Sequence, residues 1–192
     1  MASNINDAGI NKDYPVAGQD NDSQGFRDNF NVIKTNFTNA KSEIETLQSS
    51  TAKLNENNNH LGNQIANAVL INNSEGYYAG GTVNTSQNIN FSNGHHQSFT
   101  AGADITLTLA EWPSVGKSGT VRLYINNDGT QRTVTFNSNA GAGTLKKIST
   151  WPGAGNTAII DTPNTRTYVL EFTSYDAGAT VWANYIGYFE SC

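Results

Sequence analysis

An apolar stripe constrains this chain more than any other feature, because an apolar residue recurs at alternating intervals of four and three positions from Phe26. This 3.5-residue period is typical of helices that wrap around one another with a left-handed twist. The stripe is narrow and its flanks are mostly polar, so one helix cannot bury it alone. We expect residues 23–71 to form a coiled-coil stalk that associates with copies of itself. Its oligomerisation residues are Phe26, Phe30, Ile33, Phe37, Ile44, Leu47, Leu54, Leu61 and Ile65.

The ends of the stalk are less regular than its middle. Asp22 or Ser23 is suited to cap the first turn of the helix. Thr51 and Asn58 interrupt the apolar stripe, and Gly62 disfavours helix by about 1 kcal/mol relative to Ala. We therefore expect a kink or break near residues 55–63.

The number of helices in the stalk stays open from the repeat alone. Leu at one core position with β-branched residues at the other favours two strands, whereas the bulky Phe26, Phe30 and Phe37 favour a wider core. Few charged residues flank the stripe, so ion pairs do not dictate the pairing.

Composition argues against an ordinary enzyme. Asn, Thr, Gly and Ser make up 81 of the 192 residues, and only 14% are charged, which favours strands, turns and polar surfaces. The net charge of -5 argues against a nucleic-acid partner. No signal peptide or membrane-spanning run is found, so we expect no membrane insertion, and Cys192, the single cysteine, cannot form an intrachain disulfide.

Two further segments flank the stalk. Residues 1–22 lack a regular period and predict an irregular docking arm, ordered only against another surface, with Tyr14, Pro15 and Val16 as its apolar anchor. Residues 77–192 contain short alternating runs separated by turn residues, which predict an antiparallel β-sandwich or jelly roll of seven or eight strands. Asp128-Gly129 between two such runs predicts a hairpin.

A series of short motifs resembles virion fibre proteins of tailed bacteriophages. In the C-terminal part the similar stretches are Gly116-Lys117-Ser118-Gly119-Thr120, Asp128-Gly129-Thr130, Arg132-Thr133-Val134-Thr135-Phe136, Trp151-Pro152-Gly153, Trp182 and Gly187-Tyr188-Phe189. Residues 14–27 resemble the start of structural proteins from T4-like marine phages, and residues 33–44 resemble a segment of the trimeric neck whisker, fibritin. The chain departs from fibritin in having one short stalk and a different C-terminal tip. The resemblance implies a homotrimer in the virion, made in the host cytoplasm.

Few residues are candidates for binding a small molecule or a metal ion. His95 and His96 are candidate metal ligands only if three copies meet at an axis, and otherwise flank a turn at Gly94. Acidic residues are scattered beside turns, so we expect no catalytic residues and no cofactor. Most aromatic residues lie in alternating strands and are expected in the core, which leaves Tyr175 and Trp112 as candidates for receptor binding.

These observations predict an elongated phage fibre of arm, trimeric stalk and β tip that helps attachment to a host glycan or protein. Two alternatives remain. The chain is a purely structural neck, collar or capsid-decorating protein whose tip binds another virion protein, or it is a bacterial carbohydrate-binding module. The second alternative does not account for the heptads.

Overall fold

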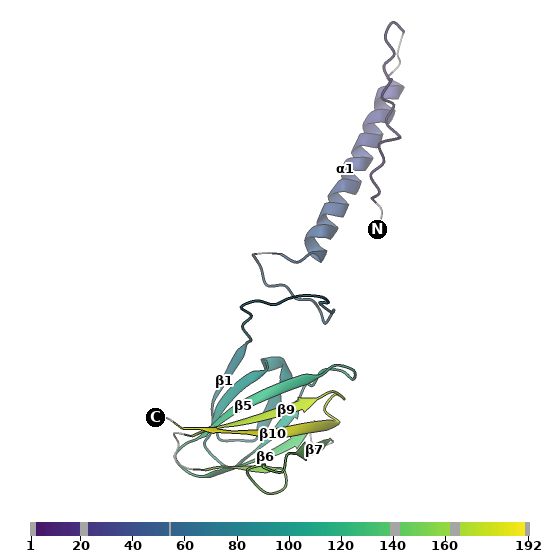
Figure 1. Cartoon of the computed structure of the whole chain (residues 1–192). Helices are drawn as coiled ribbons and strands as arrows, with labels where there is room; N and C mark the ends of the chain where they lie inside the picture. Colours follow the sequence, from purple (N-terminus) through teal and green to yellow (C-terminus); the bar gives the residue numbers. More distant parts are fainter. Residues whose placement is uncertain (1–2, 20–22, 54, 139–142, 162–165, 191–192) are drawn as a thin grey trace. The chain divides into compact units, whose positions relative to one another are not determined.

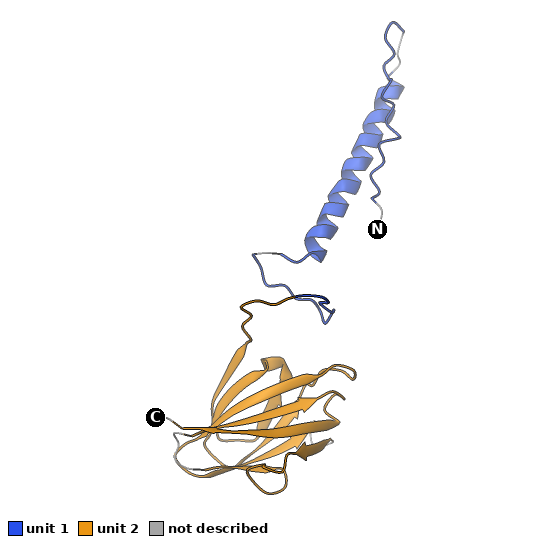
Figure 2. Ribbon diagram, in the orientation of Figure 1, with its two compact units in different colours: residues 1–68 blue, residues 69–192 orange. Residues whose placement is uncertain are grey.

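The computed structural model describes residues 3–19, 23–53, 55–138, 143–161 and 166–190. Within this part the chain has one α-helix, one short 3-10 helix and ten strands (Figure 1). It divides into two compact units, Met1–Ala68 and Val69–Cys192 (Figure 2).

The first unit is built on α1, Gln24–Ser50, with the N-terminal segment running beside it (Figure 1). Ser23 precedes the helix, but its side chain caps no backbone N–H; its Oγ accepts a hydrogen bond from Arg27 Nη2 at 3.1 Å. The expected Ser23 cap is therefore wrong, and Asp22 lies outside the described residues. No residue of α1 is buried.

The predicted stalk to residue 71 is wrong, because the helix ends at Ser50. Short hydroxyl side chains compete for the last carbonyls: Ser50 Oγ donates to Thr46 O and Thr51 Oγ1 to Leu47 O, both at 2.6 Å. Beyond them Asn58 bonds to both the N–H and the C=O of Lys53, at 2.7 Å each, which stabilises a turn in place of a helix.

Two of the predicted oligomerisation residues therefore lie outside the helix. Leu61 and Ile65 are exposed in the irregular segment that follows α1, and Leu54 is outside the described residues. The seam that remains on α1 runs from Phe26 to Leu47.

The second unit contains two sheets. The six-stranded sheet has the order β1-β3-β5-β9-β10-β7, and the four-stranded sheet β2-β4-β6-β8. The bounds are β1 Tyr77–Val83, β2 Gln87–Asn90, η1 Phe91–Asn93, β3 His96–Ala101, β4 Ile105–Ala110, β5 Gly119–Asn127, β6 Arg132–Ser138, β7 Thr144–Lys147, β8 Thr157–Ile160, β9 Thr167–Ser174 and β10 Thr180–Phe189.

Both sheets are mixed, so the predicted antiparallel topology is wrong. The chain crosses from one sheet to the other with each strand from β1 to β6, and the successive strands within each sheet are parallel. The later pairs β5–β9, β9–β10 and β6–β8 are antiparallel, and β7 is parallel to β10. The strands expected from alternation are present, but alternation does not specify the partner or its direction.

The turn at Asp128-Gly129 illustrates why predicting two strands does not predict that they pair. It connects β5 to β6 as predicted, yet these strands belong to different sheets, so the turn is an arch and not a hairpin. Asp128 accepts hydrogen bonds from Arg132 Nε at 3.0 Å and Nη2 at 2.6 Å, which ties the two ends of the arch together. Those bonds hold the pKa of the Asp128 carboxyl below its usual value.

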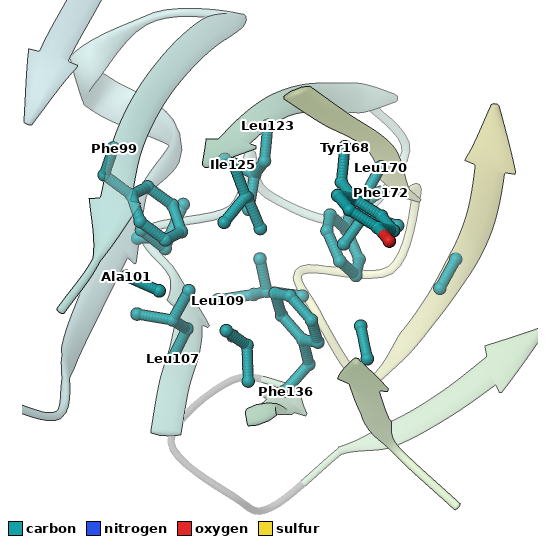
Figure 3. Packing of buried hydrophobic residues seen from close by; sticks show 14 of the residues in the cluster. Phe99, Ala101, Leu107, Leu109, Leu123, Ile125, Phe136, Tyr168, Leu170 and Phe172 are labelled. Carbon is teal, nitrogen blue, oxygen red and sulfur yellow. The ribbon is translucent and has the colours of Figure 1, made fainter. Parts of the chain in front are cut away.

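The core lies between the two sheets (Figure 3). Leu123 and Ile125 of β5 face Leu107 and Leu109 of β4 across it, and all four are fully buried. Phe136 and Phe172 pack with ring centroids 4.8 Å apart, and the Trp151 ring meets Phe172 edge-on at 6.0 Å. Because inward residues alternate with outward ones, the outer face of the six-stranded sheet remains free for polar and aromatic side chains.

Candidate functional site: an apolar helix seam and an outer sheet face

The first candidate site is the apolar seam on α1. Phe30 and Phe37 are 65% and 72% exposed, and Ile44 and Leu47 are also exposed. These side chains project from a helix whose other surface is polar, and large apolar groups clustered in this way mark an interaction surface. The exposed seam consists of the predicted oligomerisation residues that lie within the helix, and their association with other copies stays a prediction.

Residues of the N-terminal segment are attached to one side of α1, next to the seam. Asn29 bonds to the backbone N–H and C=O of Asn11, at 2.8 and 3.1 Å, and Asn36 does the same to Asn6, at 3.0 and 2.7 Å. Glu43 accepts a bond from the backbone N–H of Asn4 at 2.5 Å. These three side chains are seven residues apart and so share one side of the helix.

This arrangement corrects the expectation that the arm orders only on a foreign surface. Residues 3–19 lie against their own helix (Figure 1). Tyr14 packs edge-on against Phe26 with centroids 5.0 Å apart, and a Cβ on Gly25 would lie 2.6 Å from the Tyr14 ring. Of the predicted docking residues, Val16 is exposed, and the Tyr14–Pro15 peptide bond is cis.

The arm also widens the apolar surface. An open groove of about 380 Å³ is lined by Ile5 and Ile10 from the arm and by Ile33, Phe37 and Ala40 from the helix, with Asn36 at its margin. Arm and seam therefore form one continuous apolar surface.

The second candidate site is the outer face of the six-stranded sheet. His96 of β3, Arg122 of β5, Glu171 of β9 and Asn184 of β10 are paired across four neighbouring strands. The row spans about 14 Å at the usual strand spacing of ~4.8 Å. Arg122 donates to Glu171 Oε2 from Nε at 3.0 Å and Nη2 at 2.5 Å, and this bond raises the pKa of the Arg122 guanidinium.

The β1 end of this row is a polar depression. Glu75 Oε2 lies 3.5 Å from His95 Nδ1 and 3.2 Å from His96 Nε2, and His96 Nδ1 is 3.0 Å from the Tyr124 hydroxyl. Two adjoining hollows of about 420 and 330 Å³ share Glu75 and His96.

A metal at His95 and His96 stays an untested prediction for a threefold axis. Within the residues that the structure describes, no group of three or more His, Cys, Asp or Glu side chains is placed to hold a metal ion. His95 precedes β3 and His96 is its first residue, and both imidazoles reach Glu75.

The β7 end of the outer face carries an aromatic pair. Tyr175 and Trp182 are 53% and 40% exposed, and their rings lie 24° from parallel with centroids 6.4 Å apart. Lys146 Nζ lies over the Trp182 ring, 4.9 Å from its centroid. Opposite Trp182 on β9 is Thr173, whose hydroxyl is 3.1 Å from that of Thr120.

Of the two receptor candidates, only Tyr175 has the expected exposure. Trp112 is partly buried and packs against the core beside Phe91, with centroids 6.1 Å apart. Sequence reasoning placed Trp182 in the core because β10 alternates there. Its neighbours Val181 and Ala183 are the buried residues, so Trp182 must face outward.

Comparison with known proteins returned no relative. No protein-family model matches the chain, and no curated protein and no solved structure matches it. Among the described residues, no helix has the length and apolar character needed to cross a membrane.

Proposed function

We propose that this chain is a structural fibre protein of a tailed-bacteriophage virion, in which three copies associate through α1 and each presents a β domain that helps attachment to the host surface. The chain acts by binding and assembly, without a cofactor or a catalytic step. The observation that carries the proposal is the exposed seam of Phe30, Phe37, Ile44 and Leu47 on a helix that buries none of its residues.

The energy available at the seam supports self-association. Covering one large apolar side chain contributes about 1.5–3 kcal/mol. The four seam residues together therefore supply several kcal/mol for each chain, which a polar α-helix does not obtain from its own contacts. The bulky Phe residues favour a wide core, and the likeness to the trimeric whisker supports three copies.

Charge on the two sides of the seam supports a parallel arrangement. The arm binds the side marked by Asn29, Asn36 and Glu43, and the opposite side of the seam carries Arg27, Lys34 and Lys41. In a parallel coiled coil these two sides meet between neighbouring helices. The arm, which includes Asp7 and the ion pair Lys12–Asp13, would then lie beside the basic side of the next copy.

Sedimentation equilibrium of the full chain tests the assembly. We expect three times the 20.7 kDa of one chain. The double variant Phe30→Ser/Phe37→Ser should sediment as a monomer, and the matched variant Thr35→Ala/Ser42→Ala, on the far side of the helix, should remain a trimer. A monomeric wild-type chain would remove the proposal, and a dimer would remove the likeness to the trimeric whisker.

The location is tested separately. Antibodies to the full chain, applied with immunogold to particles of the phage that encodes it, should label a fixed position on the tail, neck or head. Particles that carry no label would exclude a virion protein, whatever the oligomeric state.

A purely structural role for the tip is the second candidate, and one feature favours it. Only residues 180–183 of β10 pair with β7, so residues 184–189 pair on one side alone among the described strands. Ile186 and Phe189 are exposed on this segment. An open strand edge with apolar side chains is suited to adding a strand from another protein. Saturable binding of the trimer to host cells supports attachment, and binding to another virion protein alone supports the structural role.

A further inference from the structure

The outer face of the β domain contains an aromatic pair that its own core does not need. The rings of Tyr175 and Trp182 lie nearly parallel, with 6.4 Å between their centroids, on the side of the sheet away from the core, and both residues remain about half exposed. Water solvates an exposed aromatic face poorly, so contact with another apolar surface is favourable. It is well matched by the C–H face of a sugar ring, which is apolar on its faces and polar at its edge.

Lys146, the cation beside this aromatic pair, favours a negatively charged ligand. Lys146 Nζ lies 4.9 Å from the centre of the Trp182 ring, and no carboxylate of the described residues forms an ion pair with it. Arg122, which lies three strands away on β5, is in contrast engaged by Glu171. A carboxylate at the edge of a sugar stacked on the pair would therefore meet the ammonium group of Lys146.

Hydrogen-bonding groups continue from the pair across the sheet. The Thr120–Thr173 hydroxyl pair is the next position along the Trp182 row, and Asn184, two residues from Trp182, extends from the same face. Beyond them lies the hollow lined by Thr120, Arg122, Glu171 and Glu75. Hydroxyl, amide and carboxylate groups in this density are suited to the several hydroxyls of an oligosaccharide.

We propose that Tyr175, Trp182 and Lys146 form a binding site for an acidic sugar residue of a glycan, with the ring stacked on the aromatic pair and its carboxylate at Lys146. The following sugars extend over Thr120, Thr173 and Asn184 toward the Arg122–Glu171 pair. The proposal rests on the proposed attachment function, because it names the class of ligand for the same tip.

Trp182 also supplies the signal for the test. The full-length protein is titrated with digalacturonate and with uncharged galactobiose while Trp fluorescence is recorded. We expect saturable quenching by digalacturonate, and affinity for galactobiose that is about two- to fivefold weaker, the size of one exposed ion pair. The affinity for digalacturonate alone should fall as salt is added.

Variants assign the site. Trp182→Ala and Tyr175→Ala should each weaken binding of digalacturonate about tenfold, as measured by calorimetry. Lys146→Gln should abolish the preference for the acidic sugar. Lys147→Gln, the neighbouring lysine, and Tyr78→Ala, a half-exposed tyrosine of β1, are the matched controls and should leave binding unchanged. Lys146→Arg should retain the preference, which separates loss of charge from misfolding.

Three results would contradict the proposed sugar site. Absence of binding to digalacturonate, binding that survives Trp182→Ala, or a preference that survives Lys146→Gln would overturn the site. Because a soluble disaccharide occupies one site at a time, this measurement does not depend on assembly. A trimer that binds no acidic sugar leaves the fibre standing without this site, and a monomer that binds it leaves the site standing without the fibre.

Discussion

The two units of this chain use their apolar side chains in opposite ways. In Val69–Cys192 the two sheets enclose Leu107, Leu123 and Phe136, which have no exposed surface. In α1 no residue is buried, and Phe37 is among the most exposed large apolar side chains of the helix. The β domain therefore contains the contacts that stabilise it, whereas α1 leaves its apolar seam exposed.

We expect the largest loss of stability when a fully buried core residue is truncated. Phe172 is fully buried and packs against both Phe136 and Trp151, so Phe172→Ala should lower the free energy of unfolding of the β domain by about 3–5 kcal/mol. Urea denaturation followed by near-UV circular dichroism measures this loss. Ile159→Ala, at a partly exposed position of β8, is the control and should cost much less. Equal losses in the two variants would contradict the described core.

The second prediction concerns the thermal stability of α1 and its dependence on protein concentration. If copies cover the seam, melting of α1 should move to higher temperature as protein concentration rises, while melting of the β domain stays constant. Phe30→Ser/Phe37→Ser should remove that dependence, with a loss of about 1.5–3 kcal/mol for each side chain. Far-UV circular dichroism over a hundredfold concentration range checks it. A helix transition independent of concentration in the wild type would break the comparison.

A smaller effect is expected at the arm. Asn36→Ala removes two hydrogen bonds to the backbone of Asn6, and at this exposed position we expect a loss of about 1 kcal/mol in arm docking. Amide hydrogen exchange at residues 3–19 should accelerate while exchange within α1 changes little. Thr35→Ala, whose hydroxyl bonds only within the helix to Asn31 O, is the control. Unchanged exchange in the arm would show that these bonds do not hold it.

The smallest effect depends on pH and belongs to the turn between β9 and β10. The Thr180 backbone N–H donates to Asp176 at 2.8 Å and Ser174 Oγ donates at 3.0 Å, and these bonds lower the pKa of the Asp176 carboxyl below its usual 3.8. A lowered folded-state pKa contributes stability that is complete above pH 3.8 and is lost as pH falls through the folded value. Carbon-detected NMR titration should show Asp176 titrating below 3.8, and Asp176→Asn should remove this part of the acid sensitivity. A titration at or above 3.8 would contradict the hydrogen bonds.

Much of the β domain follows from alternation in the sequence, but its topology does not. The alternating residues of 120–125 and 132–136 correctly predict β5 and β6, because apolar residues two apart share one face. Asp128-Gly129 correctly predicts the turn, but whether it folds back within a sheet or crosses to a second one depends on how both apolar faces find cover.

The candidate sites divide in the same way. The apolar seam is predicted by the spacing of Phe30, Phe37 and Ile44. The exposure of Tyr175 is predicted by its position in a turn. Trp182 is not readable, because an alternating strand does not state which of its faces is buried. The attachment of the arm is also missed, although Asn29, Asn36 and Glu43 at intervals of seven were a signal for it.

The amino-acid sequence alone determined that an apolar stripe begins near Phe26, that helix weakens after Thr51, and that the C-terminal part is made of strands. Local propensity and periodicity suffice for these, since each involves residues within a few positions of one another. Only the tertiary structure decided the mixed sheets, the outward Trp182 and the return of the arm along α1. Each of these depends on contacts between distant residues, whose pairing is chosen by the burial and hydrogen bonding of the whole unit.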